Sequence, residues 1–273
     1  MNVYGNPVRI LHRLWRYREL LVQLTVREIT QRYRGTYLGI LWSFITPFCM
    51  LLIYTFVFSI VFQAKWGQID QAIGRSEFAL TLYAGLIPFT VFSEVVNRAP
   101  MLILSVPNYV KKVVFPLEIL PLVALGSALI HSLISIGILV VGVALLLGSV
   151  SPAIVLLPLA YVPLILLCLG LGWFLASLGT YVRDIGQSVA LVVQVLIFMS
   201  PVFYPITAVP EQLRIVLYIN PLTTILDGFR RTLLWQQTLA WEPWIAWTAI
   251  TAILALLGYM WFMKTKPGFA DVM

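Results

Sequence analysis

Few residues of this chain combine an ionisable side chain with an apolar setting in which it could do chemistry. Glu94, Glu118 and His131 lie within long apolar segments or near their ends. Proton- and sodium-coupled carriers keep such groups in the membrane, because a coupling ion needs a partner there. Both glutamates fall near segment ends, and a lone histidine in an apolar helix is more often a hydrogen-bonded packing residue than a proton relay. Ion-coupled transport is therefore not expected.

Sequence motifs for nucleotide hydrolysis, metal binding and nucleophilic catalysis are missing. The chain has no GxxxxGK[ST] phosphate loop, no HExxH, no paired CxxC and no readable Ser-His-Asp set. Cys49 and Cys168 lie inside apolar segments, where inert packing is expected. We predict no catalytic residue, metal site or cofactor in this chain, so energy for active transport would come from another polypeptide.

Two apolar segments each carry a face that is unusual against lipid. Residues at three- and four-residue steps, which share one helix face, are Phe44, Phe48, Leu51, Thr55, Phe58 and Phe62 in the first segment and Gln187, Gln194, Phe198, Pro201 and Pro205 in the second. A glutamine amide needs hydrogen-bonding partners in lipid. The two faces suggest a conduit wall, along which sugar rings slide over aromatic rings; the alternative is helix packing with interfacial aromatic anchoring.

The composition places these residues in a membrane protein. The 273 residues are 60% hydrophobic and 11% charged, with a mean hydropathy of +0.93, whereas a soluble domain has about 25% charged residues. The formal charge of +7 is spread between apolar segments instead of forming one basic domain. Anionic lipid is therefore the expected counter-charge, and nucleic acid is not an expected partner.

Apolar segments of the length that crosses a bilayer, about 20 residues, organise the whole chain. We predict an all-α integral membrane domain over residues 1–273, with a cytoplasmic interface helix in 1–37, spans between 38 and 263, and a cytoplasmic tail in 264–273. The six predicted spans are 38–63, 78–96, 117–148, 153–181, 187–206 and 243–263. Of the 18 Lys and Arg residues, 13 lie in the N-terminal segment, the second-to-third and fourth-to-fifth loops and the tail. The positive-inside rule therefore places both termini in the cytoplasm.

Before the first span, apolar residues at helical spacing indicate an amphipathic helix. They are Ile10, Leu14, Tyr17, Leu21 and Leu24. The arginines lie elsewhere around such a helix, so it would rest in the cytoplasmic interface of the membrane. The alternative is a solvated helix docked on a partner.

Between the fifth and sixth spans, two short helices are predicted. Pro210 with Glu211 is a good helix start, and Asn220 with Pro221 supplies an N-cap followed by a first-turn proline. Each helix has about ten residues and thus spans about 15 Å, half a bilayer. A re-entrant or interfacial hairpin on the outer side fits these lengths. The proline-broken end of the fifth span before it points to a gate, and a simple helix terminus is the alternative explanation of Pro205.

Five sequence blocks and the tail together resemble the polysaccharide-export permeases over essentially the whole chain. The blocks are REITQRYRGTYLGILWSFITP (Arg27–Pro47), VPNYVKKVVFPLEILP (Val106–Pro121), YVRDIGQ (Tyr181–Gln187), SPVFYP (Ser200–Pro205) and NPLTTILDGFRR (Asn220–Arg231), and the tail is GFADVM (Gly268–Met273). These permeases are type 2 membrane subunits of ATP-binding cassette (ABC) transporters, which export O-antigens, capsules and teichoic acids.

The resemblance implies a homodimer bound to two copies of a separate ABC ATPase, which holds ATP and Mg. It also implies a bacterial inner (cytoplasmic) membrane location and a lipid-pyrophosphate-linked glycan as substrate. The glycan would enter from the cytoplasmic side and leave through a conduit between the two membrane subunits. By the family pattern the first and fifth spans line that conduit, through Phe44, Phe48, Thr55, Phe58, Phe62, Gln187, Gln194 and Phe198.

Further roles follow from the resemblance residue by residue. The cytoplasmic mouth would offer Arg27, Arg32, Tyr33 and Arg34 to the pyrophosphate, where guanidinium groups form paired hydrogen bonds; their alternative role is topology and lipid contact. The outer gate would comprise Pro201, Phe203, Tyr204, Pro205, Asn220, Pro221, Arg230 and Arg231. The ATPase contact would comprise Asn108, Tyr109, Lys111, Lys112, Phe115 and Pro116, with Arg183 and Asp184 as a second contact or a loop ion pair.

Two other functions remain open on the sequence. A drug or small-lipid exporter of the same superfamily would share the six spans but gives no reason for both aromatic stripes. An uncoupled membrane channel or scaffold would lack an ATPase partner.

Overall fold

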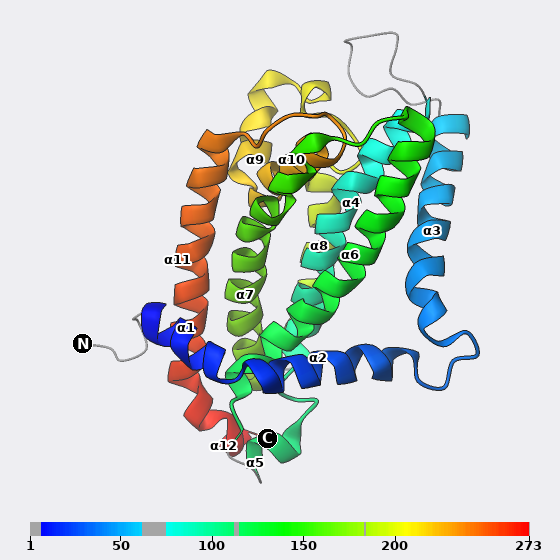
Figure 1. Cartoon of the computed structure of the whole chain (residues 1–273). Helices are drawn as coiled ribbons and strands as arrows, with labels where there is room; N and C mark the ends of the chain where they lie inside the picture. The colour runs from blue at the N-terminus through cyan, green and yellow to red at the C-terminus, as the bar shows by residue number, and fades with distance from the viewer. Residues whose placement is uncertain (1–6, 62–74, 112–114, 183, 273) are drawn as a thin grey trace.

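The protein is a bundle of helices. The computed structural model describes residues 7–61, 75–111, 115–182 and 184–272, which form helices and turns with no strand among them. The helices that run side by side along the bundle in Figure 1 include α3 (Trp42–Tyr54), α4 (Arg75–Arg98), α6 (Leu120–Leu147), α7 (Leu157–Tyr181) and α11 (Trp241–Thr265). Phe62, Lys112 and Arg183, each given a role above, lie outside the described residues.

Further helices and turns complete the bundle. The other α-helices are α1 (Pro7–Arg16), α2 (Arg18–Tyr33), α5 (Pro107–Lys111), α8 (Ile185–Met199), α9 (Arg214–Ile219), α10 (Pro221–Leu233) and α12 (Phe269–Val272). The remaining turns are η1 (Gly39–Leu41), the π-helical η2 (Thr55–Val61), η3 (Ala99–Met101), η4 (Leu117–Ile119), η5 (Pro152–Leu156), η6 (Ile206–Ala208), η7 (Glu211–Leu213) and η8 (Lys266–Gly268).

Among the described residues, five helical segments are long and apolar enough to cross a membrane. They are Gly39–Val57, Glu77–Met101, Leu117–Leu147, Pro152–Tyr181 and Trp241–Val272. These match the predicted first, second, third, fourth and sixth spans. The chain is therefore a multi-pass, helical membrane protein.

The predicted fifth span is shorter than expected. Its helix, α8, has 15 residues and ends at Met199, whereas the prediction continued to residue 206. The backbone becomes extended at Ser200, and Pro201 follows, which has no N–H with which to continue the helical hydrogen bonds. At about 1.5 Å per residue α8 extends about 22 Å, less than the hydrocarbon core of a bilayer.

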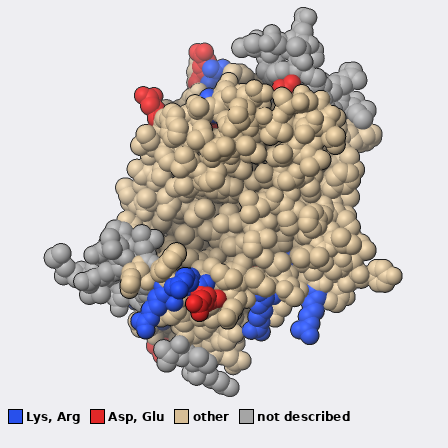
Figure 2. All heavy atoms as spheres, viewed as in Figure 1, with Lys and Arg blue, Asp and Glu red and all other residues tan. Residues whose placement is uncertain are grey.

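Both ends of the described chain lie at the same end of the bundle. In Figure 1, α1 and α12 are at the lower end, and α9 and α10 are at the upper end. Figure 2 shows Lys and Arg gathered along the lower end of the face in view, a few charged residues at the upper end, and a wide uncharged belt between. The lower end is thus the end with α1 and α12, and the upper end is the end with α9 and α10.

Helix α4 is the centre of the bundle. It packs against α6, α7, α8 and α10, and most of its apolar side chains are buried. On one side of it, α7 and α11 form the closest helix pair. A Cβ on Gly258 would lie 2.2 Å from the Gly170 carbonyl oxygen, so the two backbones touch where glycine permits it.

The N-terminal segment forms two helices instead of one continuous helix, with Tyr17 at the break. Helix α2 crosses the lower end of α6 (Figure 1), and the buried Thr25 of α2 sits in the space left by Gly126 of α6. Of the predicted apolar stripe, Ile10 is buried in the core and Leu14 packs against it. Ile10 and Leu14 of the predicted stripe therefore face the protein.

Candidate functional site

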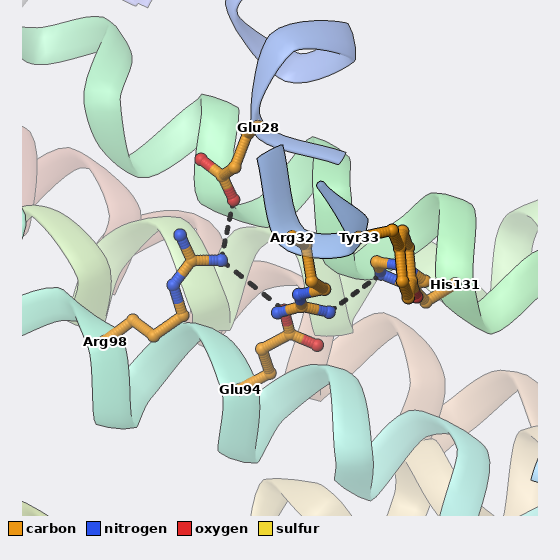
Figure 3. Close-up of polar contacts among 6 residues, drawn as sticks. All are labelled: Glu28, Arg32, Tyr33, Glu94, Arg98 and His131. Atoms are coloured by element: carbon orange, nitrogen blue, oxygen red, sulfur yellow. Dashed lines mark hydrogen bonds and ion pairs between the residues drawn. The ribbon is translucent and has the colours of Figure 1, made fainter. Parts of the chain in front are cut away.

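A cluster of six polar side chains joins α2 to the lower ends of α4 and α6. Its members are Glu28, Arg32 and Tyr33 from α2, Glu94 and Arg98 from α4, and His131 from α6 (Figure 3). Arg98 Nη1 lies 2.6 Å from Glu28 Oε1 and 3.4 Å from Glu94 Oε1, and Arg32 is ion-paired with Glu94. The two arginines and two glutamates therefore balance in charge.

His131 connects the charged part of the cluster to Tyr33. Arg32 Nη1 lies 3.1 Å from His131 Nδ1, and the Tyr33 hydroxyl lies 2.8 Å from Nε2. A guanidinium group only donates, so Nδ1 accepts, and in the neutral ring Nε2 carries the proton and donates to Tyr33. His131 is thus hydrogen-bonded through both nitrogens.

The environment keeps the guanidinium of Arg32 charged. Partial burial disfavours the charge, but the hydrogen bond to Glu94 and the negative charges of Glu94 and Glu28 outweigh it, and the pKa of Arg32 lies above its ordinary value. Arg32 therefore stays a cation at physiological pH.

A cavity of about 460 Å³ opens directly above this cluster. It lies between α2, α3, α4 and α6, and its lining changes from charged at the floor to mainly apolar, aromatic and hydroxyl side chains. The lining residues are Arg32, Tyr33, Trp42, Ser43, Thr46, Pro47, Met50, Tyr54, Tyr83, Leu86, Ile87, Thr90, Val91, Glu94, Ala128, His131, Ser132 and Ser135. A space of this kind suits an amphiphile, whose polar and apolar parts need different walls.

Of the four residues predicted to bind a headgroup, the structure brings two together. Arg32 and Tyr33 lie in the cluster at the cavity floor. Arg27 and Arg34 are exposed at the surface. An anion near Arg32 would meet a guanidinium that already pairs with Glu94.

Most of the predicted conduit residues whose side chains the structure describes lie on the surface of the single chain. Phe44 and Phe48 of α3 are about half exposed, at 50% and 51%, and Phe198 of α8 is 65% exposed. Gln187 and Gln194 are also exposed. Thr55 is half-buried, and its hydroxyl donates to the Leu51 carbonyl within the helix, at 2.7 Å. Phe58 lies in η2, and its side chain is outside the described set.

At the upper end, Arg230 holds the broken end of α8 against α4. Its Nη1 donates to the Pro201 carbonyl at 2.7 Å, Nη2 to Val202 at 2.9 Å, and Nε to Thr81 at 3.1 Å. The side chain is buried, and Gly85 leaves room for it, since a Cβ there would lie 2.4 Å from Nη2. Two backbone carbonyls at the helix break, those of Pro201 and Val202, and one carbonyl of α4 thus receive donors from one side chain.

Asn220, Phe203 and Tyr204 of the predicted gate contact residues at the same break. Asn220 caps α10 by accepting from the Leu222 amide at 3.0 Å, and its Nδ2 donates to Ser200 Oγ at 2.9 Å. Tyr204 donates to the Phe198 carbonyl at 2.8 Å, and Phe203 lies against the Phe198 ring. Further residues of the predicted gate are Pro205, which precedes η6, Pro221, which begins α10, and Arg231, which pairs with Asp227 at 2.5 Å.

The predicted ATPase contact lies at the lower end. Helix α5 protrudes there (Figure 1), with Asn108 exposed and Lys111 as its last residue. Tyr109 stacks on Phe115, with ring centroids 4.5 Å apart, so α5 lies next to the described residues Phe115 and Pro116. Asp184 is exposed at the turn between α7 and α8.

Two features of these sites were missed from the sequence. Glu28 and Arg98 were not assigned to the cluster, and Arg230 was not expected to bind carbonyl groups. Both depend on partners distant in sequence: Glu28 and Arg98 are 70 residues apart, and Arg230 and Thr81 are 149 apart. The weak signal was that Glu94 and Arg98 stand one helical turn apart at the end of an apolar segment.

Comparisons with known proteins place this arrangement in a transporter family. A family profile described as ABC-2 type transporter matches residues 19–234. The chain is 27% identical over 228 residues to an O-antigen export system permease protein RfbA of Myxococcus xanthus, covering 82% of this chain and 83% of that protein. It is 26% identical over 258 residues to an RfbA of Klebsiella pneumoniae, covering 93% and 95%. It is 26% identical over 216 residues to a polysialic acid transport protein KpsM of Escherichia coli, covering 77% and 80%.

Proposed function

The chain belongs to the ABC-2 type transporter family, and from this we propose that it is the membrane subunit of an ATP-driven exporter of a lipid-linked polysaccharide, an O-antigen or a related surface glycan. The similarity to O-antigen and polysialic acid export proteins, over most of both chains, carries the proposal. The chain has no phosphate loop, so ATP and Mg bind to a separate ATPase, in two copies per membrane dimer. The bacterial inner membrane is the site of export.

Six crossings, with both termini in the cytoplasm, agree best with the fold. Helix α8 starts at the lower end, after α7, and is followed at the upper end by α9 and α10. Although it is short, α8 together with Ser200–Tyr204 completes a sixth crossing, and an even number of crossings returns the chain to the lower end. Lys and Arg at that end fit the positive-inside rule. On this topology α1 and α2 lie at the cytoplasmic interface, and α9 and α10 are re-entrant or interfacial helices of the outer gate.

The conduit forms between two copies of the chain. Phe44, Phe48 and Phe198 are large, apolar and exposed, and Gln187 and Gln194 are exposed amides that a hydrocarbon environment disfavours. In a dimer these faces of α3 and α8 enclose a passage where aromatic rings contact sugar rings and amides contact hydroxyl groups. The lipid-pyrophosphate end of the substrate engages the arginines around the cytoplasmic mouth, near the cavity above Arg32 and Tyr33.

Nucleotide-driven movement of the ATPase pushes α5, and the push travels through the contacts at the lower ends of α4 and α6. The cluster of Figure 3 links those helices to α2, so the interface helix moves with them. At the outer end, Arg230 links the residues that follow α8 to α4, so these residues move when α4 moves.

Deletion and complementation in the native host test this function. Cells that lack the chain should accumulate lipid-linked glycan at the inner face of the membrane and lose the surface glycan, and the intact chain should restore export. Purification of the tagged chain should recover an ABC ATPase. Normal surface glycan in the deletion strain would reject polysaccharide export and favour a drug or small-lipid exporter if the ATPase still co-purifies. Consistent absence of an ATPase would favour an uncoupled channel or scaffold.

A further inference from the structure

The last residues of the chain are anchored to the lower end of the bundle through a buried ion pair. Lys266 Nζ lies 2.6 Å from Glu118 Oε2, and the Glu118 side chain is fully buried. A buried carboxylate needs a counter-charge, because its transfer from water is otherwise strongly unfavourable. Lys266 meets that need from 148 residues away in sequence. The pair therefore fixes the tail to the segment before α6.

Helix α7 holds the same tail from the other side. The Tyr181 hydroxyl donates to the Thr265 carbonyl at 2.9 Å, and the Ser177 and Thr265 hydroxyl oxygens are 2.7 Å apart. Gly268 passes so close that a Cβ there would lie 2.6 Å from the Tyr181 oxygen. Beyond it, Phe269 is fully buried against the rings of Tyr181 and Phe262, at centroid distances of 6.0 and 5.4 Å.

The tail also reaches both ends of the segment predicted to contact the ATPase, called the coupling loop below, whose described residues are 107–111, 115 and 116. Its last helix, α12, packs against α5, which begins the loop (Figure 1). Glu118 stands two residues beyond Pro116, where the loop ends. A helix of five residues has little stability of its own, so α5 depends on tertiary contacts for a fixed position.

We propose that residues 265–272 are a brace that positions the coupling loop for its ATPase partner, with Lys266 and Phe269 as the positioning residues. The proposal rests on the proposed function. The loop can deliver a push to the bundle only if it is rigid. The brace is held by α7 and by the Glu118 segment, and it contacts the loop through the packing of α12 on α5. The exposed Asp271 and Val272 of α12 then border the surface that the ATPase meets.

Two lysines of one helix end provide a matched test. Lys266→Met removes the ammonium from the ion pair, whereas Lys264→Met removes the same charge from an exposed position two residues earlier. Each variant is reconstituted in nanodiscs, its affinity for the purified ATPase is measured by titration, and amide hydrogen exchange is followed by mass spectrometry. Lys266→Met should weaken ATPase binding about tenfold, about 1.4 kcal/mol. It should also speed exchange in residues 107–111 while exchange in α4 and α11 stays unchanged.

Two companion variants separate positioning from general damage. Glu118→Gln combined with Lys266→Met removes the buried carboxylate charge together with the ammonium and should recover part of the binding. Deletion of residues 269–273 removes α12 but keeps the ion pair, and it should weaken ATPase binding as Lys266→Met does. It therefore tests the brace even if the Lys266→Met chain fails to insert into the membrane. Equal affinity and equal exchange for Lys266→Met and Lys264→Met, or an unaltered deletion variant, would overturn the brace. Failure of the unmodified chain to bind any ATPase would instead count against the proposed function, and exchange in residues 107–111 would still test the brace.

Discussion

At the scale of single residues, charge balance explains why so many ionisable groups can sit at the foot of an apolar bundle. Glu28, Arg32, Glu94 and Arg98 neutralise each other across α2 and α4, and Arg98 contacts both glutamates. Partly buried charges are tolerated when they are paired. The loss of one partner leaves the other charge uncompensated in surroundings that solvate it poorly. The cluster is therefore expected to respond to changes as a unit and not as independent pairs.

A double-mutant cycle on Glu28 and Arg98 measures that dependence. Glu28→Gln and Arg98→Gln should each lower the thermal unfolding temperature in detergent, Arg98→Gln more because two glutamates lose a partner. The double variant should be less destabilised than the sum predicts, with a coupling of about 1 kcal/mol. The exposed pair Arg18 and Glu19, whose charged atoms are 3.8 Å apart, is the control and should give a coupling near zero. Additive effects for Glu28 and Arg98 would show that the contact of Figure 3 contributes nothing.

A second residue-scale prediction concerns the space that Gly85 leaves for Arg230. Gly85→Ala would place a Cβ 2.4 Å from Nη2, which displaces the guanidinium and leaves the Pro201 and Val202 carbonyls without this donor. An unsatisfied buried polar group costs about 1–3 kcal/mol, so the unfolding temperature and export should both fall. The control is Gly137→Ala on α6, where a Cβ meets no atom within 4 Å. Equal behaviour of the two variants would contradict the role of Arg230.

At the scale of helices, the sequence predicted what depends on length and hydropathy. The predicted third span, 117–148, agrees with Leu117–Leu147, and the predicted fourth, 153–181, agrees with Pro152–Tyr181. The predicted end of α8 was too late, because the apolar character of the sequence continues through Val202 and Phe203, whereas the helix ends before Pro201. The break at Tyr17 was not predicted either, since the apolar spacing continues through it. Contacts between helices, such as Tyr33 with His131, are set by packing that periodicity does not contain.

The exposed faces of α3 and α8 give a prediction at the same scale. Phe48→Ala with Phe198→Ala should reduce export of glycan several-fold while ATPase binding and ATP hydrolysis persist, because the lost rings contact the passing sugars and not the helix core. Surface glycan is quantified by gel and immunoblot, and hydrolysis by phosphate release. Leu145→Ala with Ile253→Ala removes exposed apolar groups of α6 and α11 and should leave export intact. Full export in the aromatic variant would remove these faces from the conduit.

At the scale of the whole molecule, the orientation of the bundle determines every assignment of an inner mouth and an outer gate. Asn108 on α5 and Thr207 on η6 are both exposed and lie at opposite ends of the bundle. With both native cysteines replaced by alanine, a single cysteine at position 207 should react with a membrane-impermeant maleimide in intact spheroplasts. A single cysteine at position 108 should react only after the membrane is opened. The reason is the excess of Lys and Arg at the lower end, which favours retention of that end in the cytoplasm. Labelling of both positions from the same side would contradict the six crossings, and labelling of position 108 alone in intact spheroplasts would invert the molecule and exchange its mouth with its gate.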